Sequence, residues 1–228
     1  HSPGAWSESG GTREHSGGCD HTQAAILSFH PVKHICCGEG GAVLTNDEEL
    51  AERIIHLRSH GIVRTNDPDG TKPWFYEQTD LGWNYRLTDI QSALGISQLA
   101  RLDQFLERRR ILASRYQNAL SNAPFSDIFS LPLTNLGHAW HLYVIRFHKN
   151  GQRDKAHLFL KERGILTQIH YIPIYRHPYY ERLLGKVRLP GAEIFYESCL
   201  SIPLFPKMSD SEQDRVIEVL ADFAKQAI

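Results

Sequence analysis

The stretch that decides the fold runs from residue 24 to residue 33 and reads Ala-Ala-Ile-Leu-Ser-Phe-His-Pro-Val-Lys. Its apolar half has the composition of a β-strand, and the polar end that follows places Lys33 in a turn. A Gly-Glu-Gly-Gly segment at residues 38–41 then leads into a second short strand over residues 42–45. The first strand is expected to be buried, and Lys is almost never buried without a partner. Lys33 is therefore either a nucleophile with a desolvated amine or a loop residue with its charge in water.

The sequence Ser-Phe-His-Pro-x-Lys, followed by Gly-Glu-Gly-Gly, resembles the DegT/DnrJ/EryC1/StrS family of sugar aminotransferases. These enzymes use pyridoxal phosphate (PLP). The resemblance implies that Lys33 forms the aldimine with PLP and that the Ser28 hydroxyl donates to its phosphate. For Ser28 the alternative is a strand-ending serine bonded to its own backbone. A dehydratase branch of the family carries His in place of the lysine, so Lys33 argues against that branch.

A second match covers residues 84–95, Asn-Tyr-Arg-Leu-Thr-Asp-Ile-Gln-Ser-Ala-Leu-Gly. The resemblance implies that Asn84 reaches the PLP phosphate of the partner subunit in a homodimer with shared active sites. Arg86 is suited to a sugar-nucleotide phosphate because its guanidinium binds such groups through two parallel hydrogen bonds. The alternatives are an ion pair for Arg86 and a plain turn position for Asn84.

A third match lies at residues 170–180 and begins with His170 and Tyr171. It is densest in the subgroup that makes aminated precursors of pseudaminic acid. The resemblance implies that these two side chains contact the nucleotide or pyrophosphate of the substrate. Packing in an aromatic cluster is the alternative.

The first residue also bears on the resemblance. His1 falls at the His or Gln of the family's Asp-x-x-His/Gln motif, whose side chain lies beside the cofactor. The Asp of that motif would precede residue 1, so we expect this chain to be the C-terminal part of a longer enzyme. Two alternatives stay open: a truncated, non-catalytic copy, and a fragment that works beside a separate N-terminal chain.

The resemblance implies the α/β fold of PLP-dependent transferases, the aspartate aminotransferase type I fold. Residues 1–121 would be the C-terminal part of the large PLP-binding domain, and residues 122–228 the small C-terminal domain. The pattern of apolar residues predicts helices over residues 48–59, 88–102, 105–120 and 154–163 and another after a Ser209 cap, with strands over 138–147 and 165–169. Asn46-Asp47 and Thr88 or a neighbour are expected to cap the first two helices. We expect loops at 1–20 and 61–76, the second one over the active site or dimer interface, and a linker at 122–135. Residues 108–110, Arg-Arg-Arg, are expected on a solvated helix face.

Composition excludes several classes of protein. A net charge of −1 argues against nucleic-acid binding. The sequence contains no run of eighteen apolar residues, which a membrane-spanning helix would need. The four cysteines form no disulfide framework or metal-ligand pattern, so we expect reduced thiols, no metal site and a cytoplasmic location. The resemblance implies an enzyme that moves an amino group from an amino acid, glutamate in most of the family, to a nucleotide-linked 4-keto-6-deoxy sugar.

Overall fold

The computed structural model describes residues 3–64 and 69–227. The chain divides into two compact units, His1–Asp103 (unit 1) and Gln104–Ile228 (unit 2). The domain boundary after residue 121 stays a prediction. His1, which the sequence placed beside the cofactor, lies outside the described residues.

Unit 1 opens with a β-hairpin of β1 (Trp6–Ser9) and β2 (Thr12–His15), so the loop predicted for residues 1–20 is wrong there. The turn consists of Gly10 and Gly11, whose φ angles are +57° and +82°. Two positive φ angles in a row match the twist of a two-residue hairpin, and glycine adopts them without strain. The two glycines favour the hairpin turn, and the strands on either side lack the alternating apolar residues by which a strand is predicted from sequence.

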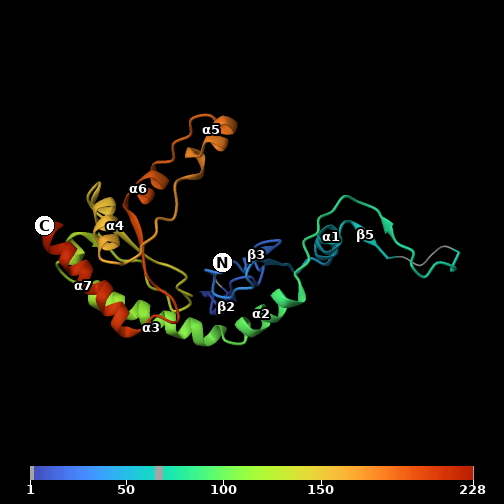
Figure 1. The fold of residues 1–228 in the computed structure, drawn as a ribbon, viewed down its shortest axis with the longest axis horizontal. Coiled ribbons are helices and arrows are strands. Elements are labelled where there is room, and N and C mark those ends of the chain that lie inside the picture. Colours follow the sequence, from blue (N-terminus) through green and yellow to red (C-terminus); the bar gives the residue numbers. More distant parts are fainter. Residues whose placement is uncertain (1–2, 65–68, 228) are drawn as a thin grey trace. The chain divides into compact units, whose positions relative to one another are not determined.

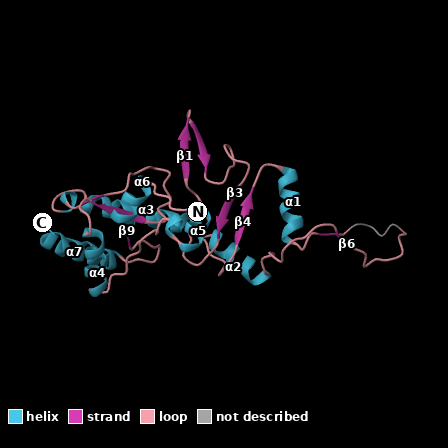
Figure 2. Ribbon diagram, turned by 90° about the horizontal axis from the view of Figure 1, so that it is seen from above, coloured by secondary structure: helices cyan, strands magenta, loops and turns pink. Residues whose placement is uncertain are grey.

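The predicted lysine strand and its neighbour form an antiparallel pair, β3 (Ala25–Ser28) and β4 (Gly41–Leu44), drawn side by side in Figure 2. Ser28 pairs with Gly41, where a Cβ would lie 2.7 Å from the carbonyl oxygen of Leu27. The expected burial of the first strand is wrong, because Ile26 is 71% exposed. Among the described residues β4 is the one strand that pairs with β3, so the pair stands without the flanking strands that bury a central strand.

Two capped helices complete unit 1, together with the short antiparallel strands β5 (Ile62–Val63) and β6 (Glu77–Gln78). Helix α1 (Glu48–Arg58) begins after Asp47, which accepts a hydrogen bond from the backbone N–H of Leu50. Helix α2 (Asp89–Leu99) begins after Thr88 in a capping box with Gln91. Both N-caps confirm the sequence prediction. No described residue of either helix is buried.

Unit 2 is built around a three-stranded antiparallel sheet in the order β7-β8-β9. The long helix α3 (Leu102–Leu120) leads into it, and α7 (Asp210–Ala227) runs alongside α3 (Figure 1). The remaining elements are 3-10 helix η1 (Phe125–Asp127), β7 (Phe129–Ser130), β8 (Tyr143–Phe147), α4 (Gln152–Glu162), 3-10 helix η2 (Ile174–Arg176), α5 (Pro178–Leu184), α6 (Pro190–Ser198) and β9 (Cys199–Ile202).

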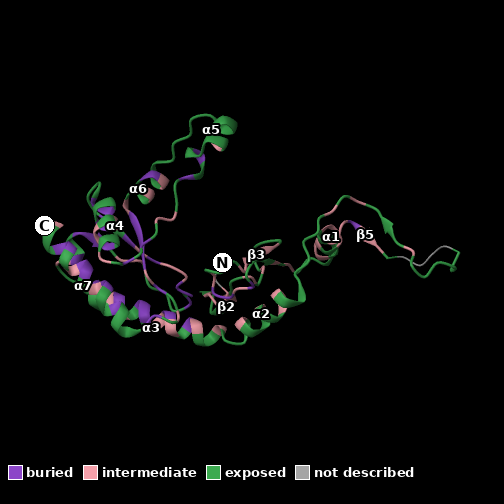
Figure 3. Ribbon diagram, in the orientation of Figure 1, coloured by how far each residue is buried: buried purple, intermediate pink, exposed green. Residues whose placement is uncertain are grey.

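The hydrophobic core of unit 2 joins α3, α4, α7 and the sheet, and Figure 3 shows the buried residues gathered on them. Its fully buried side chains include Leu112, Tyr116, Tyr143, Leu200 and Leu220. The predicted linker at 122–135 is wrong, since Phe125, Ile128 and Phe129 are buried in this core. Two strand predictions also need correction. Residues 138–142 are not in β8, and residues 165–169 contribute only an isolated bridge from Gln168 to Ser201, because the apolar runs there end in loops.

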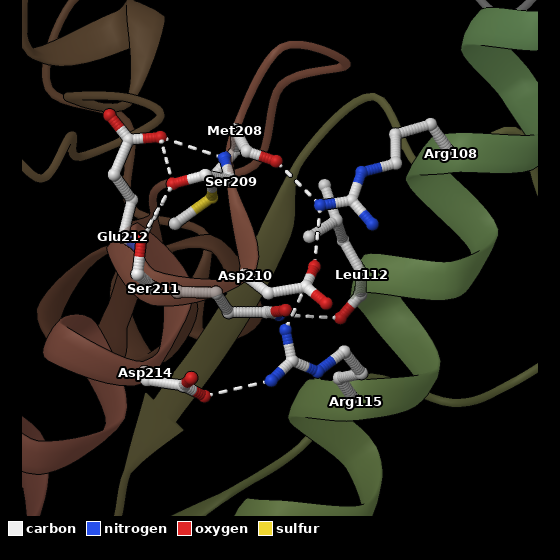
Figure 4. Close-up of polar contacts among 10 residues, drawn as sticks. Arg108, Leu112, Arg115, Met208, Ser209, Asp210, Ser211, Glu212 and Asp214 are labelled. Carbon is white, nitrogen blue, oxygen red and sulfur yellow. Dashed lines mark hydrogen bonds and ion pairs between the residues drawn. The ribbon is translucent and has the colours of Figure 1, made fainter.

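The arginine run on α3 is not a solvated face. Arg109 is 4% exposed and donates to the carbonyl oxygens of Trp140, His141 and Leu204 at 2.9–3.1 Å. Arg108 donates to the carbonyl oxygen of Met208 and to Asp210 at the start of α7 (Figure 4). By composition, three neighbouring arginines suggest a charged surface. Here the carbonyl oxygens belong to loop residues, outside the hydrogen bonding of helices and strands, and Arg108 and Arg109 supply the hydrogen-bond donors that these carbonyls need.

Figure 4 also shows how the same two helices are joined lower down: Arg115 pairs with Asp210 and Asp214, at 3.0 Å and 2.8 Å. The Gln213 amide donates to the carbonyl oxygen of Leu112 at 2.7 Å. Ser209 caps α7 as predicted, in a capping box with Glu212. These polar contacts fix the start of α7 against the middle of α3.

All four cysteines are free thiols. Across the described ranges no group of three or more His, Cys, Asp and Glu side chains is arranged to hold a metal ion. In the same part of the chain no helix has the length and apolar character that crossing a membrane requires.

Candidate active site

Lys33 lies on a loop, residues 29–40, that connects β3 to β4. Phe29 closes the base of this loop: its N–H donates to the carbonyl of Gly40, and its carbonyl accepts from the N–H of Cys37, both at 2.9 Å. A turn within the loop joins the N–H of Lys33 to the carbonyl of His30 at 2.9 Å. Backbone hydrogen bonds at the base of the loop and in the turn within it therefore fix the position of Lys33. The sequence predicted that Lys33 lies in a turn after the strand, and it does.

The residues that follow Lys33 anchor the loop, while Lys33 itself is half-buried. His34, Ile35 and Cys37 are 2%, 5% and 4% exposed. Burial, with a smaller contribution from the adjacent Cys36, raises the pKa of the Cys37 thiol. Cys37 is thus a neutral, packed side chain at neutral pH, and the buried residues 34, 35 and 37 hold the loop directly after Lys33.

Ser28 ends β3 five residues before Lys33. Its Oγ accepts a hydrogen bond from the N–H of His30 at 3.4 Å, which is the local turn contact that the sequence left as an alternative. A hydroxyl that accepts one hydrogen bond still has its own hydrogen to donate. The turn contact and a phosphate contact are therefore compatible at this residue.

The segment with Asn84 and Arg86 is held against the end of α1. The backbone N–H groups of Trp83 and Tyr85 donate to the carbonyls of Leu57 and Arg58 at 2.7 Å and 3.0 Å, and Asn84 bridges Ser59. Gly82 permits this approach, since a Cβ there would lie 2.3 Å from the backbone nitrogen of Gly61. Backbone hydrogen bonds therefore hold residues 83–85 across the end of α1.

An ion pair secures the chain just before that crossing. Asp80 accepts from Arg53 of α1 and from the backbone N–H of Leu81. The Arg53 hydrogen bond, followed by the Leu81 bond, lowers the pKa of the Asp80 carboxyl. Asp80 is therefore charged at neutral pH and holds the start of the segment to α1.

An open cavity of about 960 Å³ adjoins this segment. Asn84 and Arg86 line it together with Gly40 and Gly41 from the lysine loop and strand β4. Both side chains are exposed, and Arg86 makes no ion pair with another described residue, which weighs against the ion-pair alternative. Ser28 and Lys33 are not among the described residues that line the cavity. The rest of the lining is mainly apolar: Ile26, Leu27, Phe29, Ala42, Val43, Ala51, Ile54, Ile55 and Leu87.

His170 and Tyr171 belong to unit 2. The Nδ1 atom of His170 lies 2.8 Å from the Ser201 hydroxyl, and its ring meets that of Tyr171 edge-on at 4.6 Å. Tyr171 is 70% exposed. His170 is thus packed on β9, as the packing alternative requires, while the Tyr171 ring remains open to a ligand.

Gln91 is a functional candidate that the sequence reasoning missed. Its side-chain nitrogen donates to the carbonyl oxygen of Glu39, in the lysine loop, at 3.0 Å. The Thr-x-x-Gln spacing at residues 88–91 is a capping-box signature and could have marked it. The capping-box signature predicts the hydrogen bonds of the Gln91 side-chain oxygen. It does not predict that the side-chain nitrogen contacts Glu39, 52 residues earlier in the chain.

The residues around Lys33 fit PLP by the chemistry of their donors. Between residues 28 and 38 the chain offers a hydroxyl, a primary amine and backbone N–H groups, and it contains no acidic side chain. Such a set suits an anionic phosphate that also carries an aldehyde, because the amine reacts with the aldehyde and the donors bind the anion.

Comparison with known proteins agrees with this set. The profile of the DegT/DnrJ/EryC1/StrS aminotransferase family matches residues 7–221. The spore coat polysaccharide biosynthesis protein SpsC of Bacillus subtilis (strain 168) is 38% identical over 212 residues, which cover 90% of this chain and 54% of SpsC.

Solved structures give the same result. PseC of Helicobacter pylori, an aminotransferase involved in the biosynthesis of pseudoaminic acid, superposes with a TM-score of 0.82 at 32% identity, over 90% of this chain and 54% of PseC. The PLP-form of Spr1654 from Streptococcus pneumoniae has a TM-score of 0.82 at 25% identity, over 94% of this chain and 54% of its own. The chain spans about half the length of the relatives it matches.

Proposed function

Because the chain belongs to the DegT/DnrJ/EryC1/StrS aminotransferase family, we propose that it carries the catalytic lysine of a PLP-dependent sugar aminotransferase. The family match confirms the resemblance and the predicted α/β fold of PLP-dependent transferases, fold type I. PLP is the cofactor of this family. The observation that carries the proposal is Lys33 itself, held on a closed loop five residues after the Ser28 hydroxyl.

The proposed reaction moves an amino group from glutamate to a nucleotide-linked 4-keto-6-deoxy sugar. PseC, which takes part in pseudoaminic acid biosynthesis, and SpsC, which takes part in spore coat polysaccharide biosynthesis, support a sugar as the substrate. The nucleotide, the keto position and the amino donor rest on the sequence motifs. A cytoplasmic location is proposed with them.

Lys33 and Ser28 carry the chemistry in this proposal. The Lys33 amine would hold the cofactor and would also serve as the base that moves the proton at the α-carbon of the amino donor. The Ser28 hydroxyl donates to the cofactor phosphate. When bound, PLP supplies the electron sink that stabilises negative charge at that carbon. One base that is fixed beside the reacting carbon gains most of its effect from proximity.

The remaining residues bind and orient. Arg86, exposed and without an ion-pair partner in the described chain, binds a phosphate of the nucleotide. In the proposed homodimer, Asn84 reaches the cofactor phosphate of the other subunit. Tyr171, which is 70% exposed, contacts the nucleotide, with the His170 ring packed edge-on beside it.

Reductive labelling tests the proposal. The purified chain is mixed with PLP, reduced with borohydride and mapped by peptides, beside the variants Lys33→Arg and Lys161→Arg. Lys161 is an exposed residue of α4 and serves as the matched control. We expect an absorbance band near the visible edge and one dominant label on Lys33, lost in Lys33→Arg and kept in Lys161→Arg. Labelling spread evenly over surface lysines would overturn the proposal and favour a non-catalytic copy.

A further inference from the structure

The side chain of Gln91 uses its two ends for different purposes. The Oε1 atom accepts hydrogen bonds from the backbone N–H and the hydroxyl of Thr88, both at 3.0 Å, and so completes the capping box of α2. The Nε2 atom donates to the carbonyl oxygen of Glu39 at 3.0 Å. A single amide therefore joins the start of α2 to the lysine loop.

Close packing accompanies that hydrogen bond. A Cβ on Gly40 would lie 2.7 Å from Cδ2 of Leu87, and a Cβ on Gly95 would lie 2.7 Å from Sγ of Cys37. The loop thus rests on α2 and on the residue before its cap, with no room for a side chain at either glycine. Van der Waals packing has no preferred direction, so by itself it would let the loop shift along α2. The hydrogen bond from Gln91 to the Glu39 carbonyl is directional and fixes the loop at one position.

We propose that Gln91 is a positioning residue that fixes the lysine loop against the start of α2 and so sets the place of Lys33 relative to the segment that carries Arg86. This inference rests on the proposed function, because it is Lys33 whose position matters. The capping box fixes the oxygen end of Gln91, so the nitrogen end has one direction in which to point. Four residues lie between Arg86 and Gln91, and the second of these, Thr88, is already fixed as the N-cap of α2.

The substitution Gln91→Glu separates the two tasks. Glutamate is a good third residue of a capping box, so the helix start is kept. The donor to the Glu39 carbonyl is replaced by a carboxylate oxygen, which repels that carbonyl. Gln104→Glu is the matched control: Gln104 is also the third residue of a helix, α3, and is exposed.

The first measurement is hydrogen exchange of the chain without added PLP. In Gln91→Glu we expect the peptides that cover residues 33–41 to exchange about fivefold faster than in Gln104→Glu, as loss of one hydrogen bond predicts. The variant Thr88→Ala removes the cap instead and should speed exchange in the first turn of α2 more than in the loop. Equal effects of both variants on both segments would overturn the assignment.

The second measurement follows Lys33 itself. Borohydride labelling with PLP is compared over a pH series in Gln91→Glu and Gln104→Glu. We expect the preference for Lys33 over Lys161 to fall across the whole series in Gln91→Glu and to persist in Gln104→Glu. If Lys33 is never labelled preferentially in the parent chain, the proposed function fails. If it is labelled, and Gln91→Glu matches Gln104→Glu in both exchange and labelling, the positioning role alone fails.

Discussion

The two units of the chain differ in how they are held together. Unit 2 has a core that joins α3, α4, α7 and a three-stranded sheet, with many fully buried side chains. Unit 1 carries the lysine loop, yet no described residue of α1 or α2 is buried. Large apolar side chains on its surface, such as Leu81 and Ile90, are 84% exposed.

The proposed catalytic lysine and the large hydrophobic core therefore lie in different units of the chain. Unit 1 is held by local devices: glycine crossings, helix caps, backbone bonds and the Gln91 contact. Unit 2 adds one large hydrophobic core to contacts of this kind, although loop residues such as Leu133 and Leu136 are 93% and 85% exposed. Substitutions in the two units should therefore have very different effects on unfolding.

Truncating a buried leucine of unit 2 should destabilise the protein far more than truncating an exposed isoleucine of unit 1. Leu220 is fully buried in unit 2, so Leu220→Ala should lower the free energy of unfolding by roughly 2–5 kcal/mol. Ile90→Ala, on the exposed face of α2, should change it by less than about 0.5 kcal/mol. Urea unfolding followed by circular dichroism measures both. Similar losses in the two variants would mean that Ile90 contributes as much to stability as a residue of the unit 2 core.

The second test concerns a polar contact of the same core. Burial lowers the pKa of Arg109 to about 10, so the guanidinium is still charged at neutral pH. Arg109→Met leaves two buried carbonyls and one half-buried carbonyl without their donor and should cost roughly 2–4 kcal/mol in urea unfolding.

Its neighbour provides the control. Arg110 has a single ion pair with Glu107, at 3.8 Å, so Arg110→Met should stay within about 0.5 kcal/mol of the parent chain. If the two methionine variants unfold at the same urea concentration, Arg109 is not the link between α3 and the segments it contacts.

The smallest expected effect is a pH dependence at the rim of unit 2. The hydrogen bond from Arg108, with the charge of Arg115, lowers the pKa of Asp210 below its ordinary value of 3.8. Its carboxylate is more acidic in the folded chain than in the unfolded one. It therefore stabilises the fold above that ordinary value, and the contribution disappears as pH falls through the lowered pKa.

Asp210→Asn should accordingly lower the urea midpoint at pH 7 and leave it almost unchanged near the acid end of the series. Asp127→Asn, an exposed change in the same unit, serves as the control. Added salt should shrink the difference at pH 7, because exposed charges are screened. A difference that grows on acidification would contradict the assignment.

Local signals along the sequence predicted local structure well. Asp47, Thr88 and Ser209 were predicted as N-caps and are confirmed, because a cap depends on residues within one turn. The strand, turn and loop around Lys33 follow from the same kind of short-range chemistry. The family, fold class and cofactor came from the motifs at residues 28–41, 84–95 and 170–180.

Long-range contacts were beyond those signals. Arg109 looks like one of three surface arginines until the carbonyls of residues 140, 141 and 204 are brought to it by the fold. The segment at 122–135 reads as a linker by its prolines, yet Phe129 packs against Phe147. At the candidate site, the contact from Gln91 to Glu39 depends on a loop and a helix start meeting, which no periodicity reports.

The contacts between α3 and the later part of unit 2 also have a consequence for how the protein is made. Tyr116, Arg109 and Leu112 bond to residues 87, 95 and 101 positions further along the chain. At typical rates of synthesis α3 leaves the ribosome on the order of 5–20 s before α7 is available. During that interval the apolar stripe of α3 faces the cell without its partner helix, which makes it the stretch that a nascent-chain chaperone would shield.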